Sequence, residues 1–120
     1  MTAINQNITI YAGDYLEIEI PVLNPTGGSI NPVGAAAKYM VAKDLSAPVP
    51  LISKHSGDGI TVSTDGPGGT MLLTIVLEPD DTADMADWGS YYHEVEIRDS
   101  EDRPFTVMTG VLTVMPAIIK

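Results

Sequence analysis

Hydrophobic and polar residues alternate along much of this chain, with the period of two that sends neighbouring side chains to opposite faces of a β-sheet. The segment 15–22 shows the pattern best, because Glu17 and Glu19 occupy one face and only aliphatic residues occupy the other: Leu16, Ile18, Ile20 and Val22. We therefore predict a strand here with one buried and one solvated face.

Three further segments show the same alternation. In residues 71–77, Leu72 and Val76 make the second face partly apolar as well, which predicts a more central strand. Residues 91–98 alternate Tyr, His, Val and Ile with mostly polar positions, and 106–115 form a Thr- and Val-rich partner. The polar loop 99–104 between these two segments predicts a hairpin.

Shorter strands are expected at 7–11, 36–43, 50–54 and 59–64, and the one helical candidate, 79–86, is long enough for a single turn. Seven or eight short strands separated by Gly-, Pro- and Asp-rich turns predict an all-β, antiparallel β-sandwich or small barrel. The positions that share the inward phase form the predicted core: Leu16, Ile18, Ile20, Leu73, Ile75, Tyr91, Val95 and Val111.

Length and composition narrow the class of protein. The 120 residues, 44% of them hydrophobic, predict one domain over 1–120 with short N- and C-terminal arms. Without cysteine, neither a disulfide nor a thiolate metal site is available. A net charge of −10 repels phosphate, so we expect no nucleic-acid partner. The N-terminus lacks the pattern of a signal peptide and no apolar run has the length of a membrane helix, so we expect a soluble protein with no membrane partner.

A short motif carries the first resemblance to a known family. The segment 87–93, Asp-Trp-Gly-Ser-Tyr-Tyr-His, resembles the D-x-G/A-x-Y-x-C signature of immunoglobulin domains, with His93 at the cysteine position. The resemblance implies that Tyr91 is the corner tyrosine, whose hydroxyl bonds to upstream backbone, and that Trp88 and Tyr91 cover one end of the core. Both cysteines of the inter-sheet disulfide are missing, which favours an immunoglobulin-like fold over an antibody-type domain.

A wider resemblance runs from Gly13 to Met115. Six segments, in their order along the chain, resemble the small sandwich domains of tailed-bacteriophage virions, notably N-terminal domains of baseplate and tail-fibre proteins. The segments are 12–14, 54–62, 72–75, the acidic turn 78–83, 89–97 and 107–114. It implies a structural or assembly protein of the tail, baseplate, fibre adaptor or decoration. Such a protein is made in the host cytoplasm, located in the virion, and partnered by other virion proteins and copies of itself.

The sequence offers little for catalysis, so we expect no enzyme, cofactor or small-molecule ligand. Ser56 and Ser90 border glycines but lack the G-x-S-x-G motif. His55 is expected in a solvated loop and His93 in a strand at the sheet interface. Glu94 and Glu96 share a face that we expect to be solvated, and the glycine-rich 66–70 lacks the lysine of a phosphate loop.

Two clusters have competing interpretations. The acidic group 78–87 offers oxygen ligands to a cation such as calcium, but lacks the EF-hand pattern. We favour Asp80 or Asp81 as the cap of a helical turn, with no metal bound. The aromatic residues Trp88, Tyr91, Tyr92 and Phe105 would suit a sugar-binding platform, so a carbohydrate-binding adhesion module is the alternative function.

The last residues of the chain are apolar where the tail of a monomer is normally polar. Ala117, Ile118 and Ile119 follow Pro116, which interrupts the preceding strand. These three residues would bury their apolar surface either by docking on their own domain or at an interface with a neighbouring chain, and we predict the interface.

Overall fold

Nine strands and one short helix make up the part of the chain that the computed structural model describes, which is residues 4–22, 35–43, 50–63, 71–83, 89–98 and 101–116. The elements in chain order are β1 (Ile4–Asn5), β2 (Ile8–Tyr11), β3 (Leu16–Val22), β4 (Ala36–Ala42), β5 (Pro50–Ser56), β6 (Gly59–Ser63), β7 (Met71–Leu77), α1 (Pro79–Ala83), β8 (Gly89–Arg98) and β9 (Pro104–Met115). The predicted all-β class is confirmed. Each expected strand, from 7–11 at the N-terminus to 106–115 at the C-terminus, overlaps a strand of the structure. Among these residues, no helix is long and apolar enough to cross a membrane.

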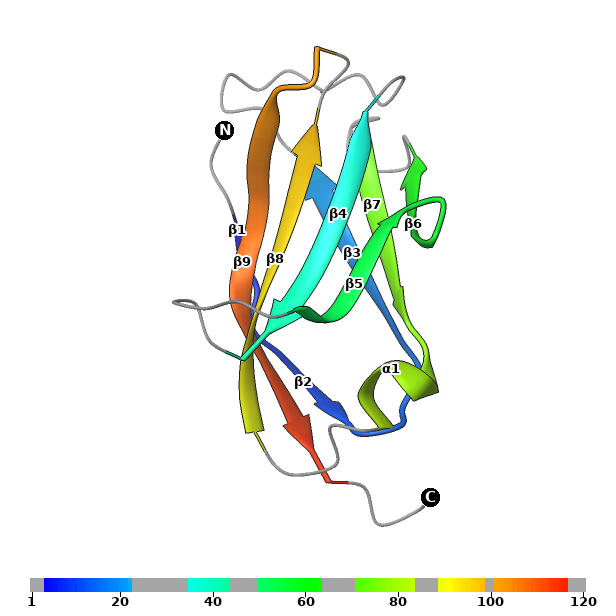
Figure 1. Ribbon diagram of the computed structural model, residues 1–120, viewed down its shortest axis with the longest axis vertical. Coiled ribbons are helices and arrows are strands. Elements are labelled where there is room, and N and C mark those ends of the chain that lie inside the picture. The colour runs from blue at the N-terminus through cyan, green and yellow to red at the C-terminus, as the bar shows by residue number, and fades with distance from the viewer. Residues whose placement is uncertain are drawn as a thin grey trace.

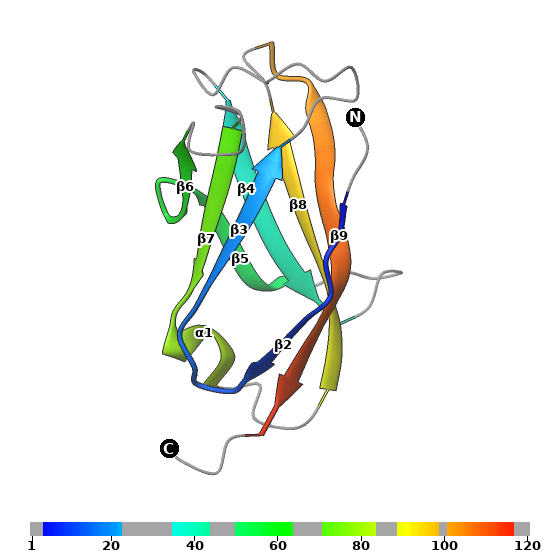
Figure 2. The same cartoon turned by 180° about the vertical axis from the view of Figure 1, so that it is seen from behind.

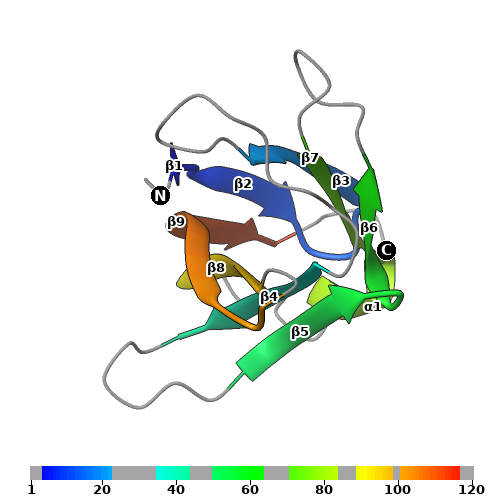
Figure 3. The ribbon, with the colours of Figure 1, turned by 90° about the horizontal axis from the view of Figure 1, so that it is seen from above.

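The strands form one curled, nearly barrel-shaped sheet in the order β1-β9-β8-β4-β5-β6-β7-β3, with β2 also paired to β9. Seen from above, β2, β3 and β7 lie across the core from β8, β4 and β5 (Figure 3). At one edge the two sides are joined through β5 and β6, which pair at only two positions, His55 with Gly59 and Ser56 with Ile60. At the other edge they are joined through β2 and β9. Figures 1 and 2 show the same arrangement from opposite faces.

The prediction of a purely antiparallel sheet is wrong, because the sheet is mixed. Both β1 and β2 run parallel to β9, with Ile4 opposite Met108 and Ile8 opposite Leu112, and β5 is parallel to β6. Parallel pairing between the two ends of the chain depends on contacts about 100 residues apart in sequence. Local alternation carries no information about such a pairing. The prediction of seven or eight strands also missed β1.

The core lies between the two sides of the sheet, and most of the predicted positions line it. Buried residues of the predicted set are Ile18, Ile20, Leu73, Ile75, Tyr91 and Val95. Leu16 is half-buried and packs against this core. As predicted, β7 is central, since it pairs with β3 on one side and β6 on the other. Its second face is half-buried throughout.

The prediction that Val111 lies in the core is wrong, and a bulge explains why. The register between β8 and β9 shifts between Val95 and Glu96, which are opposite Met108 and Thr106, so Val107 has no opposing residue. An extra residue reverses the inward phase of the strand. Beyond the bulge, Met108, Leu112 and Val114 point inward, and Val111 is left half-buried on the outer face.

The single helical turn α1 begins at Pro79. Asp81, one of the two residues predicted as its cap, caps it. The Glu78 N–H donates to Asp81 Oδ2 at 2.7 Å, and the same carboxylate oxygen lies 2.8 Å from Lys54 Nζ on β5. Farther along the turn, Thr82 is fully buried and its Oγ1 accepts the N–H of Gly13 at 2.9 Å. These bonds attach α1 to β5 and to the turn before β3.

Replacing Asp81 with alanine should therefore lower the free energy of unfolding by about 1 to 3 kcal/mol, because a helix cap and a partly buried ion pair are lost together. Urea unfolding of the purified protein measures the change. The matched control is Asp80→Ala, which removes the same charge from an exposed neighbour. Equal losses in the two variants would contradict the capping role of Asp81.

Candidate functional site

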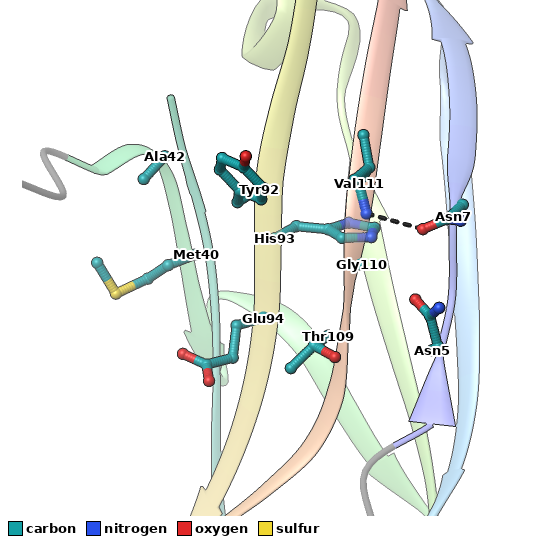
Figure 4. Close-up of a pocket in the computed structure, with 10 residues that line it drawn as sticks. All are labelled: Asn5, Asn7, Met40, Ala42, Tyr92, His93, Glu94, Thr109, Gly110 and Val111. Atoms are coloured by element: carbon teal, nitrogen blue, oxygen red, sulfur yellow. Dashed lines mark hydrogen bonds between the residues drawn. The ribbon is translucent and has the colours of Figure 1, made fainter. Parts of the chain in front are cut away.

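A hollow of about 650 Å³ opens on the outer face of β4, β8 and β9, beside the N-terminal strands. We call it the outer-face hollow. Figure 4 shows its lining as sticks. The lining residues are Asn5, Asn7, Met40, Ala42, Tyr92, His93, Glu94, Thr109, Gly110 and Val111.

Two rows of cross-strand neighbours build its surface. One row is Met40, Glu94 and Thr109, and the next is Ala42, Tyr92 and Val111. All six residues occupy positions on the outer face of the sheet. Tyr92 is 43% exposed, while Met40 and Val111 are half-buried, so an apolar surface adjoins the exposed Glu94 and Thr109.

The N-terminal segment closes one side of the hollow, and side chains rather than backbone alone hold it there. The Oδ1 atom of Asn7 accepts the N–H of Val111 at 3.0 Å, a bond visible in Figure 4. The N–H of Gln6 donates to the Thr109 carbonyl at 2.9 Å. Asn5 and Asn7 are thereby positioned as a polar rim opposite Met40 and Tyr92.

Beneath the hollow, His93 connects three segments of the chain. Its Nε2 lies 2.6 Å from the carbonyl oxygen of Gln6, and its Nδ1 lies 3.0 Å from the hydroxyl of Tyr39. Because a carbonyl can only accept, Nε2 carries the proton, and Nδ1 accepts from the Tyr39 hydroxyl. The two rings meet edge to face, with centroids 5.8 Å apart.

Gly110 makes this approach possible. It faces His93 across the β8–β9 pair, and a Cβ atom added to it would lie 2.1 Å from the Gln6 carbonyl oxygen and 3.0 Å from His93 Nε2. Only a residue without a side chain leaves room for the N-terminal segment and the imidazole together.

Both ring systems are neutral near neutral pH. Burial lowers the pKa of His93 below its usual value, and the hydrogen bond to the Gln6 carbonyl opposes this only in part. Burial, together with the negative charge of Asp81, raises the pKa of Tyr39 well above its usual range. Since both nitrogens of His93 are engaged, the imidazole is a structural connector rather than a base that faces solvent.

The structure places the other predicted polar residues in separate surroundings. His93 lies at the sheet interface as predicted, 2% exposed. His55 is exposed as predicted, but it lies in β5 and not in a loop, and its Nε2 is 3.6 Å from Asp58 Oδ2. Ser56 Oγ accepts the N–H of Ala37. Glu94 lines the outer-face hollow and Glu96 pairs with Arg98 at 3.4 Å. Within the described ranges, no three His, Cys, Asp or Glu side chains converge as a metal site would require.

Of the predicted structural corner, only Tyr91 can be placed. It is 7% exposed, Lys43 Nζ lies 6.0 Å from the centre of its ring, and its hydroxyl makes no hydrogen bond to the residues that the structure describes. Trp88 lies outside those residues, as do Asp84, Asp87 and the predicted interface residues Ala117, Ile118 and Ile119. The corner and the tail interface stay predictions.

Replacing Tyr91 with phenylalanine tests the corner. If the hydroxyl bonds to backbone in the segment just before β8, the free energy of unfolding should fall by about 1 to 3 kcal/mol, because a buried backbone group loses its partner. Thermal and urea unfolding would measure the loss, with Tyr92→Phe as the control on the exposed face. A stability unchanged in both variants would contradict the corner assignment.

The residues that the sequence analysis missed are those joined across distant segments. These residues belong to three separate stretches of sequence, with Asn5 and Asn7 in the first, Met40 in the second and Val111 in the third. No spacing within any one stretch indicates a site. The outward phase of Tyr92 and Glu94 was the available signal, and it predicted their exposure but not the hollow.

No known family model matches this chain, and no curated protein matches it. Among solved structures, similarity is found to a family 123 glycoside hydrolase from Clostridium perfringens, studied for glycolipid glycan hydrolysis, at 13% identity and a TM-score of 0.39. The match covers 97% of this chain and 23% of the hydrolase, so the chain spans about a quarter of that protein's length. A similarity of this degree carries no argument about function.

Proposed function

We propose that this chain is an immunoglobulin-like sandwich domain that serves as a structural or assembly component of a tailed-phage virion, acting through protein–protein contacts and not as an enzyme. The observation that carries the proposal is the outer-face hollow. An exposed tyrosine beside a half-buried methionine and valine, rimmed by polar groups, has the composition of a protein-binding surface.

The pairing order supports the immunoglobulin-like part of the proposal. In pairing order, β3, β7 and β6 correspond to strands B, E and D of one sheet of such a sandwich, and β4, β8 and β9 correspond to C, F and G of the other. The helical turn α1 lies between β7 and β8 in the chain. The hollow then occupies the outer face of the C-F-G sheet.

The polar residues of the site support binding rather than catalysis. A general base needs a free nitrogen or oxygen within reach of a substrate proton. His93 has both nitrogens engaged by Tyr39 and by the Gln6 carbonyl, and Glu94 has no second carboxylate among the residues lining the hollow. The arrangement is suited to hold a partner without transforming it.

Particles purified from cells that carry the gene would test the virion assignment. Quantitative mass spectrometry of the density-gradient fraction should find the chain in a fixed ratio to the major particle proteins, with several copies per particle. A chain that is abundant in the lysate but absent from the purified particles would overturn the assignment.

Carbohydrate binding is the second candidate, because one observation favours it. The ring of Tyr92 lines the same hollow as amide, carboxylate and hydroxyl groups from Asn5, Glu94 and Thr109, the kinds of group that bind sugar hydroxyls. A glycan array probed with the labelled protein separates the candidates. Saturable binding that Tyr92→Ala abolishes would support an adhesion module.

A further inference from the structure

We propose that the outer-face hollow receives an arginine side chain presented by a partner protein, an inference that rests on the proposed function in assembly. The ring of Tyr92 and the carboxylate of Glu94 would bind the guanidinium group, and the apolar surface beside them would bind its aliphatic stem.

The spacing of Tyr92 and Glu94 suits a planar cation. They lie two residues apart on β8 and point to the same outer face, which separates their Cα atoms by roughly 7 Å at about 3.3 Å per residue. A guanidinium stacked on the ring of Tyr92 can extend one N–H edge to the carboxylate of Glu94. A lysine ammonium has neither the plane nor the paired donors for both contacts.

Glu94 lacks a cation of its own in the described part of the chain. Its cross-strand neighbours are Met40 and Thr109, and its one side-chain hydrogen bond within the described ranges is a long one of 3.5 Å from Thr106 Oγ1. Glu96, two residues farther along β8, differs because it pairs with Arg98, and Asp81 of α1 pairs with Lys54. An exposed, unpaired carboxylate beside an aromatic ring is electrostatically complementary to an incoming cation.

The rest of the hollow and the charge of the chain support the same occupant. Met40 and Val111 provide the apolar surface along which the methylene groups of arginine pack. Asn5 adds an amide at the rim. The net charge of −10 attracts basic partners over distances of about a Debye length and disfavours acidic ones. A neutral saccharide would gain nothing from that charge.

The test uses the full chain labelled with ¹⁵N and small probes of matched size. N-acetyl-arginine amide should shift the amide signals of Tyr92, Glu94 and Val111 in a saturable way, in the millimolar range expected of a single side chain. N-acetyl-citrulline amide, which has the same shape without the charge, should shift them little. A set of methyl glycosides, titrated over the same concentrations, is the third arm.

Two variants test whether the arginine probe binds at Glu94. Glu94→Gln should weaken binding of the arginine probe about tenfold or more, because a charge-assisted pair is lost while the shape is kept. Glu19→Gln removes the same charge from an exposed position on β3 and should leave the affinity unchanged. The unperturbed remainder of each spectrum would show that both variants are folded.

Equal binding of citrulline, or equal effects of the two variants, would overturn the guanidinium site. Tighter binding of a methyl glycoside at the same residues would overturn it in favour of the carbohydrate candidate. Failure of the assembly function has a different signature, since it is read from the absence of the chain in purified particles, whichever probe binds.

Discussion

Replacing Gly110 with alanine should lower the free energy of unfolding by about 2 to 5 kcal/mol and loosen the N-terminal strands. The new Cβ would lie 2.1 Å from the Gln6 carbonyl oxygen and 2.7 Å from its carbon, and backbone atoms cannot move aside as the end of a side chain can. Relief requires the segment between β1 and β2 to leave β9, which breaks the hydrogen bond from His93 Nε2 to that carbonyl.

Urea unfolding gives the stability change, and amide hydrogen exchange shows where it acts. Exchange should accelerate in 4–11 and at the paired residues of β9, and little in β3 and β7. Gly13→Ala is the matched control, because nothing lies within 4 Å of its added Cβ and only its positive φ of 85° opposes the substitution. A Gly110→Ala variant that loses no more stability than Gly13→Ala would contradict the steric argument.

Replacing His93 with leucine should lower the free energy of unfolding by about 2 to 5 kcal/mol at pH 8, where the imidazole is neutral. The change leaves the fully buried hydroxyl of Tyr39 and the carbonyl of Gln6 without partners, at about 1 to 3 kcal/mol for each group. A double-mutant cycle with Tyr39→Phe isolates the pair. The double variant should lose clearly less stability than the sum of the single losses, and simple additivity would show that the two side chains do not interact.

The same histidine should make stability depend on pH in mild acid. The pKa of His93 is lowered in the folded protein by burial, so the unfolded chain binds a proton more readily, at its usual value near 6.5. Stability is therefore complete above about pH 6.5 and falls as the pH drops below that value toward the lowered pKa. In His93→Leu this part of the pH dependence should be missing, whereas His55→Leu, at an exposed position, should retain it.

The sequence alone determined where most of the strands run. Alternation over 15–22 and 71–77 predicted β3 and β7, their inward residues and the more central place of β7, because the period of a strand sends every second side chain to the core whatever the strand pairs with. The same reasoning predicted that His93 faces inward and that Glu94 faces solvent. It predicted that Asp80 or Asp81 caps α1, because capping is a contact between near neighbours, and the structure shows that Asp81 does so.

Features that depend on distant partners could be established from the three-dimensional structure alone. Because of the bulge at Val107, Leu112 lies in the core and Val111 does not. The bulge arises from the register of β9 against β8 rather than from the local pattern of β9. The parallel addition of β1 and β2 to β9 brings Gln6 against His93 and Gly110, three positions far apart in sequence. The outer-face hollow exists because of that addition, since its rim comes from the N-terminal segment and its surface from three other strands. Side-chain periodicity reports which face a residue occupies, whereas a site also requires knowing which strands lie beside it.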